Sequence, residues 1–452
     1  MFSLRNNEMA TSDKYDRQLR LWGPRGQALL SQARVVCVGS SALATETLKN
    51  IILPGVGSFL LIDDAKVDKA DLGQNFFLEA SDVGRLRGDA VTQHLLTLNP
   101  DVTGTYRFGN LSEVLKLDAS DFDLLLICQQ SLKQVAELVE KFREAKIVVV
   151  NVRGFIGTVR LFATDLEVVE SRLEEGAQPD LRLHAPFPAL SALADSIDLD
   201  ALNDAEHSHI PWILLVLKAK RNNLEDTLIE LRRMRRSHDE VNFDEAIDNA
   251  HSAFFTPRDL EICDAKKRGK FWAMKRAVSL FCKKYGNYPL PGNLLDMTSD
   301  TATFLKLQTI YQQHANAEVS LVKALLDDNV DDEYIEYYCK FASGAVGLTL
   351  SSSVGIDLTT GSVDQELRDS ESLLKWYVAM NEDCLRVPSS LDLSKERAEL
   401  TRYAGCELHA CSAVLGGIAA QEVIKLITRI FLPLDNLFIF YGSQGVGQSL
   451  KV

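Results

Sequence analysis

Hydrophobic and polar positions alternate in two different ways along this chain. From residue 14 to about 168, short apolar runs alternate with segments of helical periodicity. This alternation predicts a mostly parallel sheet with helices on its faces. The runs at 122–128 and 147–150 are largely apolar, which is typical of central strands buried on both sides. The expected strands are 34–38, 58–63, 102–107, 122–128, 146–151 and 157–163, and the expected helices are 25–32, 42–52, 84–98 and 131–143.

Beyond residue 168 the pattern changes, because strand signals become rare and a 3.6-residue period dominates up to about residue 400. In the last fifty residues helix and strand signals alternate again, with an amphipathic helix at 413–430 and a strand at 437–440. The expected helices between these parts are 209–235, 241–252, 271–285, 301–328, 331–343 and 366–380.

The fold class that follows is α/β, with a Rossmann-like domain interrupted by a large, mainly helical insertion. We expect the first segment of that domain at 1–168, the insertion at 169–400 and the closing helix and strands at 401–452. Such an insertion is tolerated because the entropy cost of closing a loop grows only slowly with its length.

Composition narrows the classes of partner. The chain has 452 residues, of which 46% are hydrophobic and 25% charged, as in soluble globular proteins. No apolar run reaches the roughly 18 residues of a membrane span, and the N-terminus lacks an apolar signal core. The net charge of −14 disfavours binding to nucleic acid, which is itself negatively charged. Eight cysteines without a Cys-x-x-Cys motif indicate reduced thiols, a cytoplasmic and/or nuclear protein and no metal site.

A degenerate nucleotide loop follows the first strand. The strand at 34–38 runs into Gly39 and a helical segment, and the second strand ends at Asp63, the order of a nucleotide-binding β-α-β unit. The motif Gly-x-Gly-x-x-Gly is broken, because Ser41 and Ala44 replace its second and third glycines. The second glycine normally lets the backbone approach a phosphate. We therefore expect the fold without its nucleotide site, which also disfavours a dinucleotide-dependent dehydrogenase.

Three segments resemble the ubiquitin-like-activating enzymes. Residues 14–23 (Lys-Tyr-Asp-Arg-Gln-Leu-Arg-Leu-Trp-Gly) resemble their opening signature, 48–57 the helix and turn after the glycine loop, and 415–425 the closing helix. Within the insertion, 207–212 and 305–311 resemble the regulatory subunits of neddylation-activating enzymes, the amyloid-precursor-protein-binding-protein type. The resemblance implies a ThiF-like pseudo-adenylation domain, with an insertion similar to the catalytic-cysteine domain but without the cysteine.

The resemblance also implies which nucleotide contacts are missing. Active adenylation domains of this family carry a pair of aspartates, an arginine and a lysine for phosphate, and an aspartate for the metal. Here Asp63 is kept but Ala65 replaces its partner, Gln74 replaces the arginine, Arg87 the lysine and Gln130 the metal aspartate. The resemblance therefore implies that this chain binds no cofactor and has no thioester cysteine, and that the partner subunit holds ATP and magnesium.

Arg17 matches an arginine that this family donates to the ATP site of the partner subunit. A guanidinium there would neutralise charge as pyrophosphate departs. The residues alone also allow Arg17 to pair with Asp16 or with another surface acid. We further expect the partner interface to include Trp212, Ile310, Tyr311, Gly416 and Gly417.

The expected function is that of a regulatory subunit, not active alone, in a heterodimer with the catalytic subunit. That heterodimer would adenylate a Nedd-type ubiquitin-like modifier and pass it to a cysteine of the partner. The conjugating enzyme is a further candidate partner. Three alternatives stay open: a subunit of a sumoylation-type enzyme, a self-sufficient adenylating homodimer, and an adaptor without a role in turnover. The large helical block favours the neddylation type, because the sumoylation counterpart lacks a block of this size.

Overall fold

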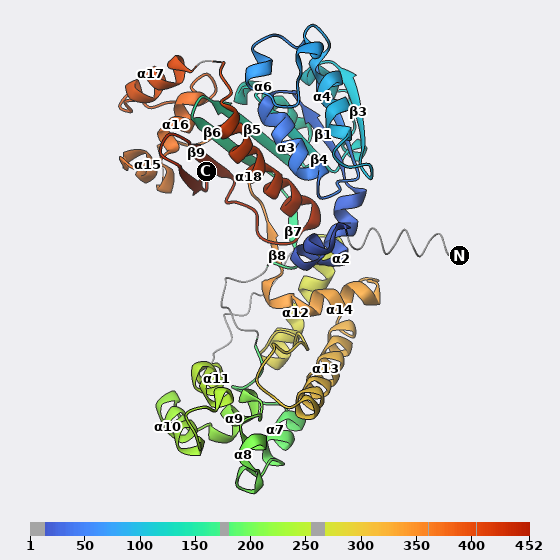
Figure 1. The fold of residues 1–452 in the computed structure, drawn as a ribbon, viewed down its shortest axis with the longest axis vertical. Helices are drawn as coiled ribbons and strands as arrows, with labels where there is room; N and C mark the ends of the chain where they lie inside the picture. Colours follow the sequence, from blue (N-terminus) through green and yellow to red (C-terminus); the bar gives the residue numbers. More distant parts are fainter. Residues whose placement is uncertain (1–13, 172–179, 255–266, 360, 404) are drawn as a thin grey trace, which may run out of the picture. The chain divides into compact units, whose positions relative to one another are not determined.

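The computed structural model describes residues 14–171, 180–254, 267–359, 361–403 and 405–452. The chain forms two compact units (Figure 1). The sheet unit comprises Met1–Val168 with Val346–Val452, and the helical unit comprises Val169–Ala345. The second boundary therefore lies at 345 and not at the expected 400. The reason is packing, because Leu374, Trp376 and Leu393 share a core with the sheet residues Leu437 and Ile439.

An eight-stranded sheet forms the centre of the sheet unit, in the order β10-β9-β6-β5-β4-β1-β2-β3. The strands from β3 to β5 in that order are parallel, and the pairings among β5, β6, β9 and β10 are antiparallel. This mostly parallel sheet confirms the predicted fold class. The strands are β1 (Arg34–Val38), β2 (Ser58–Asp63), β3 (Thr103–Phe108), β4 (Leu124–Cys128), β5 (Ile147–Arg153), β6 (Ile156–Phe162), β9 (Leu437–Tyr441) and β10 (Val446–Leu450). A separate pair joins β7 (Leu166–Val168) to β8 (Val346–Leu348).

Helices cover both faces of the sheet. One face carries α2 (Asp16–Gln32), α3 (Ala42–Ile52), α4 (Arg87–Leu96) and α18 (His409–Thr428), whose apolar residues share one core. The other face carries α5 (Leu111–Val114) and α6 (Leu132–Lys141). Beside them, α15 (Gly361–Arg368), α16 (Leu374–Met380) and α17 (Ser394–Arg402) pack on the antiparallel strands.

Helix α18 is long and apolar enough, by length and composition alone, to cross a membrane. In the fold it packs against α3, α2, β5 and β6, and 61% of its apolar window is buried. Its composition is therefore accounted for by the core that it helps to build. Figure 1 shows this red helix beside the blue α3, so the two ends of the chain meet in one core.

The described residues of the helical unit form two hydrophobic cores. Its α-helices are α7 (Pro188–Asp195), α8 (Asp204–His207), α9 (Trp212–Ala219), α10 (Leu224–Met234), α11 (Val241–Asn249), α12 (Lys270–Tyr285), α13 (Thr301–Lys323) and α14 (Asp332–Lys340). The expected helix 209–235 is in fact two helices, because the Asn223 side chain caps a new helix by accepting from the Asp226 N–H. The expected helix 366–380 is likewise divided between α15 and α16.

Two residues expected at the partner interface are core residues of the helical unit. Trp212 is 4% exposed and Tyr311 is 0% exposed, and the Tyr311 hydroxyl donates to the Leu181 carbonyl at 2.7 Å. The interface expectation is therefore wrong for both, because their own core covers them. Ile310 is half-buried, and its expected role stays a prediction.

Gly416 lies where α18 meets α3. A β-carbon at Gly416 would stand 2.9 Å from the Glu46 Cβ and 3.0 Å from the Thr47 backbone nitrogen. Its neighbour Gly417 has no atom within 4 Å of such a position. The close packing at Gly416 is thus internal to this chain, which corrects its assignment to the partner interface, while the assignment of Gly417 stays a prediction.

We expect Gly416→Ala and Gly417→Ala to have opposite effects on stability. The first should lower the free energy of unfolding by about 1–3 kcal/mol, because the new methyl group overpacks a helix contact that includes backbone. The second should leave it unchanged or raise it by up to about 1 kcal/mol, because alanine favours a helix. Urea unfolding of both variants tests this. Equal effects would contradict the assigned contact.

Candidate functional site

The site begins at the turn between β1 and α3. Gly39 has φ +89°, and a β-carbon there would lie 2.8 Å from the Cys128 carbonyl oxygen. Only glycine combines this backbone with that approach at low cost. Ser41 is the N-cap of α3 and its side chain accepts a hydrogen bond from the Ala44 N–H at 3.4 Å. Ala44 itself is fully buried in the core.

A carboxylate from the far end of the chain lies at the N-terminus of α3. The Leu43 N–H donates to Glu407 Oε2 at 2.9 Å. The side chains of Ser41 and Gln129 also favour the charged form of this carboxylate. Burial raises the pKa of Glu407 above its usual value, although the Leu43 N–H, these two side chains and the charge of Arg87 oppose the rise. The place where a nucleotide-binding helix presents its N–H groups to phosphate thus holds a carboxylate of the chain itself.

Asp63, the candidate ribose ligand, is also engaged. It is 8% exposed and accepts a hydrogen bond from the Ser40 hydroxyl. Arg87 Nε lies 3.0 Å from Ser40 Oγ and 3.4 Å from Asp63 Oδ2, and its Nη1 lies 3.0 Å from Asp71 Oδ1. The guanidinium at the position of the phosphate lysine is therefore bound to the chain's own carboxylates, which outweigh burial and raise its pKa.

Three glutamines complete the set of side chains around the β1–α3 turn. Gln74 Oε1 accepts from the Glu407 N–H at 2.9 Å, so the residue in place of the phosphate arginine fixes the Glu407 segment. Gln129 has φ +55° and pairs its amide with the backbone of Val152, at 2.7 and 2.9 Å. Gln130, in place of the metal aspartate, is half-buried and lies 3.4 Å from the Cys128 carbonyl. Amides at these positions provide no anionic ligand for magnesium.

The described residues contain no metal cluster, and five of their cysteines are shifted away from the thiolate. They include no group of three or more His, Cys, Asp or Glu side chains that could hold a metal ion. Burial raises the pKa of Cys282 and of Cys339 to about 12. Burial also raises the pKa values of Cys128, Cys384 and Cys411. Nucleophilic cysteines need the opposite shift. Cys263 lies outside the described residues.

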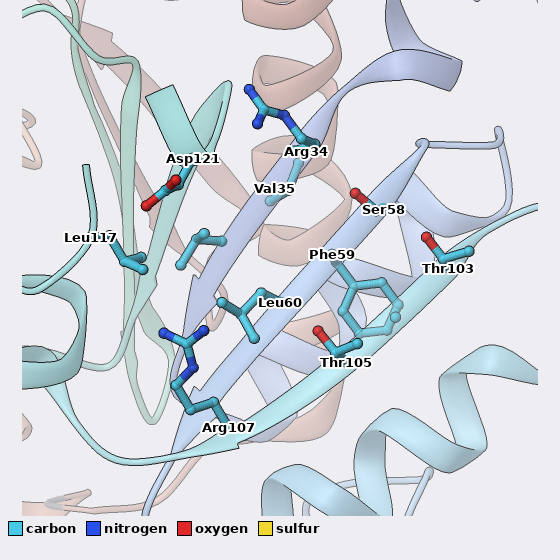
Figure 2. A pocket seen from close by; sticks show the side chains of 12 residues that line it. Arg34, Val35, Ser58, Phe59, Leu60, Thr103, Thr105, Arg107, Leu117 and Asp121 are labelled. Carbon is cyan, nitrogen blue, oxygen red and sulfur yellow. The ribbon is translucent and has the colours of Figure 1, made fainter. Parts of the chain in front are cut away.

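A cavity of about 460 Å³ lies elsewhere, on the face of β1, β2 and β3. Figure 2 shows Arg34, Leu60 and Arg107 projecting toward it from these three strands, with Leu117 and Asp121 opposite. The glycine turn stands beyond the carboxyl end of β1, whereas this cavity extends to the amino end of that strand at Arg34. The degenerate nucleotide site and the cavity are therefore separate features.

Arg17 stands in the first turn of α2, which is anchored to the sheet unit. The Tyr15 hydroxyl donates to Asp101 at 2.9 Å and lies over Gly55, where a β-carbon would come within 2.7 Å of it. Asp16 pairs with Arg20 at 3.0 Å and not with Arg17. Arg17 is exposed and has no ion pair or hydrogen bond within the described part of the chain. Pairing with Asp16, the alternative left open by the sequence, is thus excluded in this structure.

The comparisons with known proteins agree with this architecture. Residues 15–176 match the ThiF family. The chain is 31% identical to the Nedd8-activating enzyme E1 regulatory subunit of Drosophila melanogaster, over 98% of this chain and 97% of that protein. It is also 31% identical to the Gallus gallus subunit of that name, over 97% of this chain and 98% of that protein.

The chain belongs to the family of NEDD8-activating enzyme E1 regulatory subunits. The resemblance predicted from its opening, middle and closing segments is confirmed. The family extends to plants, since AXR1 of Arabidopsis thaliana is 29% identical over 97% of this chain and 96% of that protein. A solved structure of E. coli MccB with ATP covers 35% of this chain and 52% of that one, at 16% identity and a TM-score of 0.31, which is too weak to indicate function.

Sequence reasoning missed several residues that close the site in this regulatory subunit. Glu407, Gln129, Ser40 and Asp71 were not singled out, although all of them contact the predicted positions. Glu407 lies 364 residues after Leu43, so no local motif connects the two. The available signal was an isolated acidic residue immediately before the apolar closing helix.

The titration of Glu407 should make stability depend on pH. Its raised pKa means that the folded chain binds this proton more tightly than the unfolded chain. The resulting stabilisation is fully present below the ordinary glutamic acid pKa of about 4.3 and is lost as the pH rises through the raised value. We expect the unfolding free energy of the wild type minus that of Glu407→Gln to fall from about pH 4 upward and then level off. A difference that does not vary with pH would contradict the assignment.

Cys282 and Cys339 should resist alkylation in the folded chain. With a pKa near 12, the thiolate fraction at about pH 8 is on the order of 10⁻⁴ for each. Mass spectrometry after iodoacetamide treatment should find both unlabelled in the native chain and labelled in urea, with glutathione as the reactive control. Rapid native labelling of Cys282 would contradict its raised pKa and would make it a candidate for a thioester cysteine.

Proposed function

We propose that this chain is the non-catalytic subunit of a heterodimer that activates a Nedd-type modifier. The catalytic partner would hold ATP and magnesium, adenylate the modifier and transfer it to its own cysteine. This chain would stabilise that partner, add Arg17 to its ATP site and help to form the modifier groove with the helical unit. The names of the full-length relatives support the neddylation pathway and a regulatory part in it.

The proposal rests on one observation: the chain's own side chains occupy the groups around the β1–α3 turn that a nucleotide would need. ATP needs N–H groups and cations for its phosphates, a free carboxylate for its ribose and an acid for the metal. Here Leu43 donates to Glu407, Arg87 is bound by Asp63 and Asp71, and Gln130 replaces the acid. The carboxylates of Glu407, Asp63 and Asp71 would also repel a polyanion, and only the Arg87 guanidinium would attract it. This supports a site that binds no nucleotide, and it argues against the self-sufficient enzyme.

Electrostatics support the proposed role of Arg17. It lies in the first turn of a helix, where the helix dipole disfavours a cation, and it has no compensating acid in the described part of the chain. Such a cation would be stabilised by a triphosphate supplied by another chain. Arg20 on the same helix is already paired with Asp16 and serves as the natural comparison.

The free thiols of the described residues are consistent with a reducing compartment, and we propose a cytoplasmic and/or nuclear location on that ground. The conjugating enzyme of the pathway is proposed as a further, transient partner. The sumoylation-type alternative is disfavoured by the named relatives, which match this chain through its helical unit as well.

ATP–pyrophosphate exchange with the modifier tests this function. We expect exchange by the mixture of this chain and the catalytic partner, and none by this chain alone. Arg17→Ala should lower the exchange rate of the mixture by about 10- to 1,000-fold, because a charge on the departing pyrophosphate loses its counter-charge. Arg20→Ala is the matched control and should retain near wild-type exchange.

The outcomes separate the alternatives. Exchange by this chain alone would overturn the pseudo-adenylation reading. Equal rates for Arg17→Ala and the wild type, with heterodimer formation intact, would favour an adaptor without a role in turnover.

A further inference from the structure

Two N–H groups in the first turn of α3 donate to side chains of the chain itself. The first turn of a helix leaves N–H groups without intrahelical partners, and these favour an anion. In α3, Ser41 accepts from Ala44 and Glu407 accepts from Leu43. The helix has 11 residues, so its N-terminus is a developed positive end. The group located there is a complete carboxylate, carried by a residue from the opposite end of the chain.

Glu407 is held in place from several directions. Its backbone N–H donates to Gln74 Oε1 at 2.9 Å, and it forms a parallel bridge with Gly154. The Gly154 N–H donates to the Cys406 carbonyl at 2.9 Å. These contacts belong to segments far apart in sequence, and none of them involves the carboxylate itself. The side chain is therefore presented to α3 by a scaffold that would persist without its carboxyl group.

The groups around the carboxylate are those that an oxyanion would meet. The Ser41 and Gln129 side chains and the Arg87 guanidinium all favour its charged form. An N–H at a helix N-terminus beside a hydroxyl, an amide and a guanidinium is a favourable environment for a small anion. No group in this set is specific to the glutamate side chain.

We propose that Glu407 is an internal ligand that occupies a retained oxyanion site at the N-terminus of α3. The degenerate loop has kept its anion-binding character and lost its access to external anions. Because the carboxylate is tethered, an external phosphate must compete with a ligand at high effective concentration. Removing the carboxyl group should open a site for a small oxyanion, of the class of acetate or inorganic phosphate.

This inference deepens the proposed function, since it explains why the pseudo-adenylation site takes no nucleotide. It rests on that function only in treating this edge as a former nucleotide site. Thermal unfolding of the full chain, without its partner, tests this inference through stability. Failure of the Arg17 experiment would therefore leave it intact, and its own failure would leave the Arg17 proposal standing.

The experiment compares the thermal unfolding of Glu407→Ala in chloride, acetate and phosphate at matched ionic strength. We expect the variant to melt several degrees below the wild type in chloride. About 50 mM acetate or phosphate should raise its midpoint by ~3 °C or more, because an anion that binds only the folded state stabilises it. The wild type, with its site filled, should shift by less than ~1 °C.

Two controls make the result specific. Glu137 is exposed on α6, so Glu137→Ala removes one carboxylate from the surface and should respond to anions like the wild type. Glu407→Gln keeps an oxygen that can accept from Leu43 and should also show no anion-dependent shift. An equal anion response in all four proteins, or no response in Glu407→Ala, would overturn the proposal.

The proposal stays testable if Glu407→Ala does not fold in chloride. Refolding from urea in acetate or phosphate should then recover folded protein, followed by far-ultraviolet circular dichroism and gel filtration. Recovery in these salts but not in chloride supports an internal ligand. Equal failure in all three salts would overturn it.

Discussion

Helix α18 packs on α3 so closely that Gly416 has no room for a β-carbon, and the rest of the sheet unit depends on this contact. The two helices are separated in sequence by most of the chain, including the entire helical unit. Their contact closes the hydrophobic core on one face of the sheet and brings β9 and β10 beside β6. The discontinuous domain is held together because α18 buries its apolar residues against α2, α3, β5 and β6.

The same contact positions the chemistry of the site. Glu407 stands two residues before α18, and so the docking of that helix brings its carboxylate to the N-terminus of α3. Gln74 then holds the backbone of Glu407, and Arg87 faces Asp63 and Asp71. The edge is thereby closed by charges that satisfy one another. A nucleotide would have to break several of these contacts before it made any of its own.

The two arginines at positions 87 and 17 have opposite charge environments. At the edge, a guanidinium is neutralised by the carboxylates around it, which the raised pKa of Arg87 reflects. At the start of α2, Arg17 is exposed at a helix terminus that disfavours a cation, while its neighbour Asp16 is committed to Arg20. The guanidinium at the β1–α3 turn is thus neutralised within the chain, whereas the charge of Arg17 is not compensated within the described residues.

The sequence by itself determined the fold class, the strands of the parallel sheet and the loss of the glycine loop, because hydrophobic period and glycine geometry are local properties. Ser41, Gln74 and Gln130 could be recognised as departures from a motif without coordinates. Tertiary structure alone decided which side chain lies at the N-terminus of α3, since Glu407 accepts from Leu43 across 364 residues. It also decided that Trp212 and Tyr311 are core residues and that the second domain boundary lies at 345. Those outcomes depend on which apolar faces meet, and helical periodicity identifies a face without identifying its partner.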